Sequence, residues 1–170
     1  VSGLAARSRD QAEDARRRMR TQSALYDLSR KLATTIGLDD VLWAASYHMA
    51  AAVHGKRVVL LPDREDLYQA ASYPPGEELD ASDLTASRWA WQRGEPAGHG
   101  SSTLPTVTWR FEALKTSRGT VGVVGLRGAD GPLTLESDTT RAVSALIDQT
   151  AVAIERANLE EDAGKNTHPD

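Results

Sequence analysis

The first hydrophobic pattern in the chain is helical. From about Ser8 to Ile36 there is no proline or glycine, and Leu25, Leu28 and Leu32 lie three and four residues apart. This spacing predicts one long helix, which Gly37 should end because glycine favours the left-handed cap conformation. The first half is polar, with arginines at positions 16, 17, 18 and 20, so it must bridge to or pair with another element.

A second helix is expected up to about His54. Asp39 and Asp40 favour its N-terminus, where carboxylates meet unpaired amides and the positive end of the helix dipole. Its apolar face is formed by Leu42, Ala45, Met49 and Val53. Trp43 and Tyr47 form a second stripe about 100° around the helix, so we expect contacts with two neighbours.

Beyond Gly55 the spacing changes to short β-type runs, which predict strands over residues 57–61 and 67–72. Asp80 or Ser82 can cap a third helix that contains Leu84, Trp89 and Trp91 and stops before Gly94. Apolar and polar residues then alternate over residues 107–114, as in a half-buried strand whose polar face would include Leu114.

The run from Thr120 to Arg127 is rich in β-branched residues and predicts a central strand. Its glycines at 122 and 125 indicate close packing by a helix. A last helix should begin after a cap at Thr134 and continue to about Glu161. The element order predicts a mixed α+β domain with helices at both ends, and we expect a disordered tail over residues 162–170.

Composition narrows the function classes. Hydrophobic residues make up 40% of the chain and charged residues 26%, as in a folded globular domain. A formal net charge of −4 argues against a nucleic-acid partner, which would require a clustered basic surface. With no cysteine, disulfides, thiolate nucleophiles and cysteine zinc sites are excluded. The first residue is Val1 rather than methionine, so we expect a segment of a longer protein.

The stretch "EPAGHGSSTLP", residues 95–105, is the strongest candidate for chemistry. It has no lysine and therefore no phosphate-binding Walker motif. His99 with Ser101 permits a base and nucleophile, but the serine lacks the G-x-S-x-G context of hydrolases. We favour hydrogen bonds to the loop backbone. No histidine pair or acidic run has metal-ligand spacing, so no metal is expected.

Four stretches carry a resemblance to a known family. They are "LYDLSRKLA" (25–33), "VVLLPD" (58–63), "GEPAGHGSSTLP" (94–105) and "ALKTSRGTVGVVGL" (113–126). Over residues 21–159 the chain resembles the GAF domain of KdpD-type, potassium-responsive sensor histidine kinases. The resemblance implies an α+β fold, with a central, mainly antiparallel sheet and the long N- and C-terminal helices packed on one face.

The resemblance also implies a parent protein: a cytoplasmic domain of an inner-membrane kinase, between the membrane spans and a kinase core that uses ATP and Mg and phosphorylates the response regulator KdpE. The four histidines here lack the phosphoacceptor motif, so this part should be regulatory, not catalytic, and hold no cofactor. The chain also lacks the motif of cyclic-nucleotide GAF domains and the chromophore-attaching cysteine of phytochromes. A small serine/histidine hydrolase and a stand-alone ligand-binding domain remain the alternatives.

The domain boundaries and candidate sites follow from this resemblance. Residues 1–20 would be a juxtamembrane helical linker and residues 21–161 the sensory domain. The residues expected to approach a small ligand are Trp89, His99, Ser101, Ser102 and Arg110.

Self-association into a weak homodimer is expected through the first helix. Leu25, Leu28 and Leu32 have the spacing of a short coiled-coil seam, and a relay to the last helix is expected through shared contacts with Trp43 and Tyr47. The alternative is that these leucines cover the last helix of their own protomer.

Overall fold

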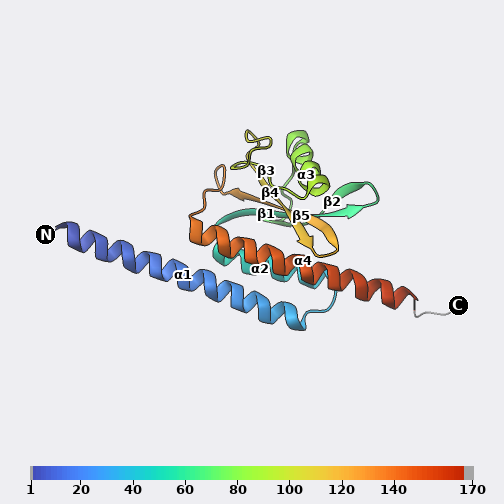
Figure 1. The fold of residues 1–170 in the computed structure, drawn as a ribbon, viewed down its shortest axis with the longest axis horizontal. Helices are drawn as coiled ribbons and strands as arrows, with labels where there is room; N and C mark the ends of the chain where they lie inside the picture. The colour runs from blue at the N-terminus through green and yellow to red at the C-terminus, as the bar shows by residue number, and fades with distance from the viewer. Residues whose placement is uncertain (1, 167–170) are drawn as a thin grey trace.

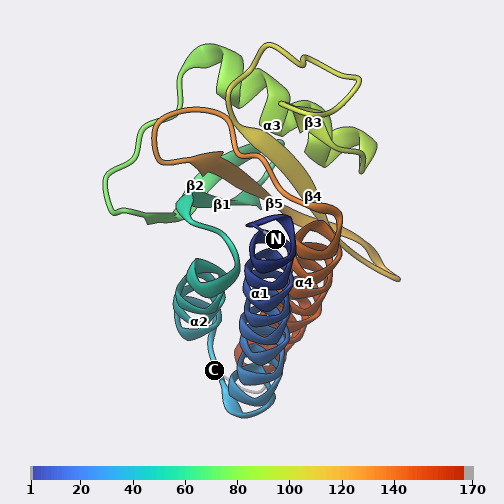
Figure 2. The ribbon, with the colours of Figure 1, turned by 90° about the vertical axis from the view of Figure 1, so that its left-hand side faces the viewer.

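The computed structural model of the protein describes residues 2–166, and the elements form three layers (Figures 1 and 2). The helices are α1 (Ser2–Thr34), α2 (Leu38–Ala52), α3 (Ala81–Arg93) and α4 (Ser137–Asn166). The strands are β1 (Gly55–Asp63), β2 (Asp66–Tyr73), β3 (Ala97–Gly98), β4 (Arg110–Thr116) and β5 (Gly119–Gly128).

The middle layer is a five-stranded sheet in the order β2-β1-β5-β4-β3, with every neighbouring pair antiparallel. The strand over 120–127 is central, as predicted. Both faces of the sheet are covered, because α1, α2 and α4 lie on one side and α3 on the other (Figure 2). The predicted α+β fold, with the terminal helices together on one face, is confirmed.

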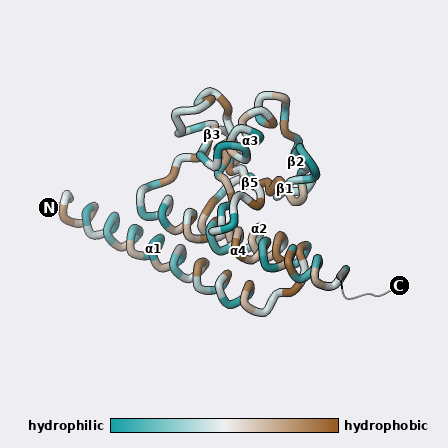
Figure 3. Tube along the Cα trace, turned by 45° about the vertical axis from the view of Figure 1, so that its right-hand side comes forward, coloured by the Kyte–Doolittle hydropathy of each residue, from teal (hydrophilic) through white to brown (hydrophobic). Residues whose placement is uncertain are grey.

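The helical face contains the larger core. Leu28 of α1, Val41 of α2 and Leu146 of α4 have no exposed surface, and they pack with residues of β1, β4 and β5. α1 is the outermost helix and packs on α2 and α4 rather than on the sheet. Its hydrophilic first half extends beyond the sheet (Figures 1 and 3).

The α3 face contains a second core in which Leu60, Trp109 and Phe111 are almost fully buried. Asp80 begins α3 with a capping box: its carboxylate accepts from the Asp83 N–H at 2.8 Å, and the Asp83 carboxylate accepts from the Asp80 N–H at 3.0 Å. Gly94 ends the helix in the left-handed conformation. Asp80 is therefore the cap, not Ser82.

Two predictions about the strands were wrong because the sheet is covered on both faces. β4 begins only at Arg110, and Leu114 is fully buried against the helical layer instead of lying on a polar face. Gly125 needs to lack a side chain because of the neighbouring strands and not because of a helix. A Cβ there would lie 2.7 Å from side-chain atoms of both Phe111 and Val58. At Gly122 the nearest atoms likewise belong to β1 and β4.

The helix ends also differ from the predictions. α4 begins at Ser137, so Thr134 does not cap it. It continues to Asn166, which makes residues 162–166 helical where a disordered tail was expected, and residues 167–170 lie outside the described part of the chain. α1 ends at Thr34, and α2 begins with Gly37 as its cap and Asp39 and Asp40 in its first turn.

Candidate functional site

The contacts between α1 and α4 have a nearly constant offset in sequence, from 119 to 124 residues. Arg17 pairs with Glu136 at 2.8 Å, across 119 residues, and Arg18 pairs with Asp138 at 3.1 Å, across 120. Further along, the Ser29 hydroxyl donates to the Gln149 side chain at 2.8 Å, again across 120 residues. Because the offset barely changes along the helices, they run parallel and in register, and Figure 1 places the start of α1 and the end of α4 at opposite ends of the long axis.

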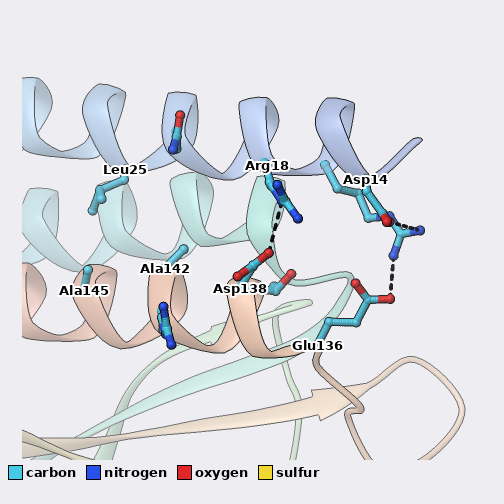
Figure 4. Close-up of a pocket in the computed structure, with 11 residues that line it drawn as sticks. Asp14, Arg18, Leu25, Glu136, Asp138, Ala142 and Ala145 are labelled. Atoms are coloured by element: carbon cyan, nitrogen blue, oxygen red, sulfur yellow. Dashed lines mark hydrogen bonds and ion pairs between the residues drawn. The ribbon is translucent and has the colours of Figure 1, made fainter. Parts of the chain in front are cut away.

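A groove of about 530 Å³ lies where α4 begins beside α1 (Figure 4). The two ion pairs cross it, and Asp14 lies 3.5 Å from Arg17 on the same helix. All these charged side chains are about half exposed or more, so water screens the pairs and each one is weak. The start of the α1–α4 contact is therefore held loosely.

The predicted seam of leucines lies inside this contact. Leu28 and Leu32 are buried, at 0% and 5% exposure, and Leu25 packs against the same core. They cover the last helix of their own protomer, which is the alternative that the sequence left open.

Trp43 and Tyr47 do not take part in the contact between α1 and α4. They stack on each other with ring centroids 5.2 Å apart, and each is 62% exposed on the outside of α2. The expected relay through their contacts is therefore not the arrangement of this structure.

The second half of α4 is tied to two other elements. The Arg156 guanidinium donates to the carbonyl oxygen of Leu32, near the C-terminal end of α1, where a cation also complements the helix dipole. The preceding Glu155 accepts a hydrogen bond from Thr116 at the end of β4. α4 is thus connected to both α1 and the β4–β5 hairpin. Sequence analysis missed these residues, because no local pattern marks a contact across 39 or 124 residues.

The "EPAGHGSSTLP" loop lies on the opposite face and is held by hydrogen bonds to backbone atoms, both its own and that of the chain just before β4. The His99 N–H donates to the Trp109 carbonyl at 3.0 Å, and the Arg110 guanidinium donates to the His99 carbonyl at 3.2 Å. The Ser101 hydroxyl lies 2.8 Å and 2.7 Å from two backbone carbonyl oxygens and accepts from the Thr103 N–H at 3.1 Å. Ser101 is used in loop structure and is not poised as a nucleophile.

The structure does not gather the five predicted ligand residues around a cavity. Ser102 is exposed, Trp89 lies under the Arg93 guanidinium at 5.9 Å, and Arg110 pairs with Glu112 at 2.8 Å. The space between α3 and the sheet is filled by Trp109 and Phe111. Four clefts of the described chain lie between helices or at their ends on the helical face, and none of these four is lined by a predicted ligand residue. Their role in binding stays a prediction.

Arg57 is a buried arginine that no pattern in the sequence predicts. Arg57, 2% exposed, donates to the carbonyl oxygens of Val53 and Gly55 at 3.1 Å each, and its guanidinium lies 4.4 Å from the centroid of the Tyr73 ring. Burial lowers the pKa of the guanidinium, and the interaction with Tyr73 partly offsets this. Arg57 thereby fastens the end of α2 to β1 and β2. An arginine at a strand start is usually exposed, so sequence offered no signal for this role.

No resident metal site or membrane span emerges from the described residues. Within residues 2–166, no three side chains of the metal-ligating types gather closely enough to hold an ion. Over the same range, no helix has both the length and the apolar character that crossing a bilayer requires. The described residues thus place α1 beside α4 on one side of the sheet, while side chains fill the space under α3 on the other.

The sequence of this chain is similar to parts of two known sensor proteins. The chain is 29% identical over 159 residues to the sensor protein KdpD of Escherichia coli (strain K12). The matched region covers 94% of this chain and 18% of the relative. It is 22% identical to the sensor protein KdpD of Clostridium acetobutylicum, covering 98% of this chain and 19% of the relative. The chain thus spans about a fifth of the length of these relatives.

Solved structures agree with the sequence comparison. The crystal structure of the GAF domain of the potassium sensor histidine kinase KdpD from Escherichia coli matches with a TM-score of 0.69 and 27% identity, covering 82% of this chain and 96% of that one. A GAF domain from an Acinetobacter phosphoenolpyruvate-protein phosphotransferase has a TM-score of 0.62 at 14% identity, covering 84% of this chain and 97% of that one. This second likeness shows the fold alone. Because a family profile described as "GAF domain" matches residues 37–156, the chain belongs to the GAF domain family, a family of regulatory and sensory domains rather than catalysts.

Proposed function

We propose that this chain is the cytoplasmic sensory domain of a KdpD-like sensor histidine kinase and that it relays a signal from the membrane region to the kinase core. The observation that carries the proposal is the parallel, in-register contact of α1 and α4. A displacement of α1 along or around its axis reaches α4 directly, without passing through the sheet. In the proposed parent, membrane spans would precede α1 and the kinase core would follow α4.

The contacts along the two helices support a relay of this kind. The buried leucines of α1 transmit a lateral movement because a close-packed core resists local compression. The hydrogen bonds of Ser29 with Gln149 and of Arg156 with the Leu32 carbonyl resist sliding. The exposed ion pairs at the start of α4 allow small changes of angle at little cost.

The parent's chemistry would lie outside this chain. The kinase core would use ATP and Mg, and the phosphoryl group would pass to the response regulator KdpE, with potassium limitation or osmotic change as the stimulus. The parent would act as a homodimer. The arginine-rich part of α1 would lie next to the inner leaflet, where anionic lipid favours basic residues.

Two buried leucines provide a matched test in the full-length kinase. Leu28 and Leu60 both have 0% exposure, but Leu28 lies between α1 and α4 and Leu60 lies on the α3 face. Each change to alanine should cost about 2–5 kcal/mol of stability. Autophosphorylation in vesicles is then measured at low and high potassium.

We expect Leu28→Ala to change the ratio of activity at low and high potassium, because it loosens the helix contact. Leu60→Ala should reduce the yield of active protein and leave the ratio unchanged. If both variants keep the wild-type ratio, or both change it equally, the relay through α1 and α4 is wrong.

A further inference from the structure

α1 has a second seam that its own domain leaves mostly exposed, with only Ser29 bonded to α4. Its positions are spaced alternately three and four residues apart over the whole helix: Ala5, Ser8, Ala12, Ala15, Met19, Gln22, Tyr26, Ser29 and Ala33. None of these nine residues is charged, although the first half of the helix is dense in charges. This is the a/d spacing of a coiled coil.

The large apolar residues of this seam face water. Met19 is 70% exposed and Tyr26 is 61% exposed, and Ile36, the next position of the repeat just beyond the helix, is 77% exposed. The buried leucines at 28 and 32 point elsewhere, so α1 presents one apolar side to its own domain and another to solvent. The small residues of the first half would let a second helix approach closely, and the large exposed ones are apolar surface that such a helix would cover.

The first half of α1 gives a further reason to expect a partner. Every described side chain from Gly3 to Arg20 is exposed, and this part projects past the sheet (Figure 1). Most of the stability of a helix in a protein comes from packing of one face rather than from helix propensity, so packing against another element would stabilise this part. The side of the helix without charges is the side that such an element would cover.

We propose that the seam binds the α1 seam of a second copy of this chain, with the two helices parallel. This inference rests on the proposed function, since it names the surface through which the parent would dimerise. The orientation follows from the flanking positions. In the same repeat, the e positions are Arg9, Arg16, Ser23 and Arg30, and the g positions are Leu4, Gln11, Arg18, Leu25 and Leu32.

Parallel pairing places each g residue opposite an e residue of the partner, five positions further along. Arg18 then meets Ser23, Gln11 meets Arg16, and neither contact joins like charges. In an antiparallel pair the e positions would face each other, and three of the four are arginines. Like charges in contact are destabilising, so the parallel arrangement is favoured.

α4 extends the same surface. Ser29 and Ala33 border a groove of about 390 Å³ whose other side includes Val152, itself 57% exposed. A second copy of α1 lying on the seam would also cover Val152. Trp43 and Tyr47 lie on α2, outside this surface, so they take no part in the proposed contact between copies.

Disulfide trapping tests the register, because the natural chain has no cysteine. Ala12→Cys places a thiol at an a position, and Asp10→Cys places one at an f position, on a nearby and equally accessible turn. In a parallel dimer, residue 12 meets its own copy, so Ala12→Cys should form a disulfide-linked dimer about tenfold faster than Asp10→Cys. Equal rates, or a faster Asp10→Cys, would overturn the parallel seam.

A pair of tyrosines tests the surface. Tyr26→Glu places a charge on the seam, while Tyr47→Glu places the same charge at a site of nearly the same exposure, 62% against 61%, on α2. Sedimentation of this chain should show a dimer dissociation constant raised about tenfold or more by Tyr26→Glu and left unchanged by Tyr47→Glu. At an a position the two introduced carboxylates would face each other across the seam, and like charges in contact are destabilising even with Arg30 nearby on each helix.

The outcomes separate this inference from the proposed function. A chain that stays monomeric at millimolar concentration, or one weakened equally by both tyrosine changes, would refute the seam. The effect of Leu28→Ala on the kinase would still stand or fall by itself, since Leu28 is not part of the seam. Conversely, trapped dimers together with an unaltered potassium response in Leu28→Ala would support the seam and refute the relay.

Discussion

The two faces of the sheet differ in how their side chains are packed and how their edges are held. On the α3 face, Trp109 and Phe111 fill the space under the helix, and the loop before β4 is fixed by bonds from His99 and Ser101 to the backbone. On the helical face, the core is larger, but its outer edge has grooves and exposed ion pairs. The α3 face is therefore packed throughout. The helical face has a well-packed interior, but its outer edge, where α1 meets the start of α4, is held only by weak exposed contacts.

This difference bears on how a sensory domain can work. Segments with few buried contacts and solvent-exposed polar interactions open at a lower free energy than a packed core. The start of the α1–α4 contact has these properties, whereas the α3 face does not. We infer that the α3 face acts as a rigid support and that movement is concentrated where α1 meets α4.

The largest difference in unfolding free energy between the two faces is expected from two glycines. Gly98 lies in β3 on the α3 side, and Gly37 lies between α1 and α2 on the helical side. Gly98 and Gly37 have similar left-handed φ angles, +92° and +98°. A Cβ at Gly98 would lie 2.0 Å from the Trp109 carbonyl oxygen, whereas a Cβ at Gly37 meets no atom within 4 Å. Gly37→Ala should cost about 1–2 kcal/mol from backbone strain alone.

Gly98→Ala should cost several kcal/mol more than this, on the order of 3–5 kcal/mol in total, since the pairing of β3 with β4 must shift as well. Urea unfolding of both variants measures the difference. Equal losses would mean that the loop on the α3 face yields easily, and the contrast between a closed face and a loose one would fail.

The sequence predicted the helices and strands better than it predicted which elements pack against them. Periodicity identified the helices and the central strand because it depends on local spacing, and Asp80 was recognisable as a cap because capping is also local. It could not say what covers an apolar face. Leu114 lies on the far side of the sheet, and Leu28 faces its own protomer, although the same spacing suits a dimer seam.

The candidate site was predicted least well, for the same reason. His99, Ser101 and Arg110 were expected to line a pocket, but whether a pocket exists depends on side chains from other elements, here Trp109 and Phe111. The offset of about 120 residues between α1 and α4 is a property of the folded chain, and nothing in either helix alone encodes it.

Asp83 should give a smaller, pH-dependent effect confined to the α3 face. It is 8% exposed, and burial raises the pKa of its carboxyl group above 3.8, while the N–H of Asp80 partly opposes the shift. The folded state therefore holds the proton more tightly than the unfolded state. The stability that this provides is present below pH 3.8 and is lost as the pH rises through the raised pKa.

Asp83→Asn stays neutral at every pH, so wild type should lose stability relative to this variant as the pH rises from 3.8. Asp66→Asn is the control with the opposite sign. The hydrogen bond from Arg88 lowers the pKa of Asp66, so wild type should lose stability relative to that variant as the pH falls. Urea unfolding on both sides of pH 3.8 measures how the unfolding free energy of wild type, relative to each variant, changes with pH. A wild-type value that does not change with pH relative to Asp83→Asn would contradict burial of Asp83 as the cause.

The smallest effect is expected at the outer edge of the helical face, in the pair between Arg18 and Asp138. Their side chains are 65% and 59% exposed, so a double-mutant cycle of Arg18→Gln and Asp138→Asn should give a coupling free energy below about 1 kcal/mol. The cycle is needed because Asp138 also lies in the first turn of α4, where its charge favours the helix dipole whether or not Arg18 is present. Added salt should reduce the coupling further, because exposed charges are screened. A coupling above about 2 kcal/mol that persists in high salt would mean that the start of the α1–α4 contact is as firmly fixed as the α3 face, and movement would then have to originate elsewhere in the domain.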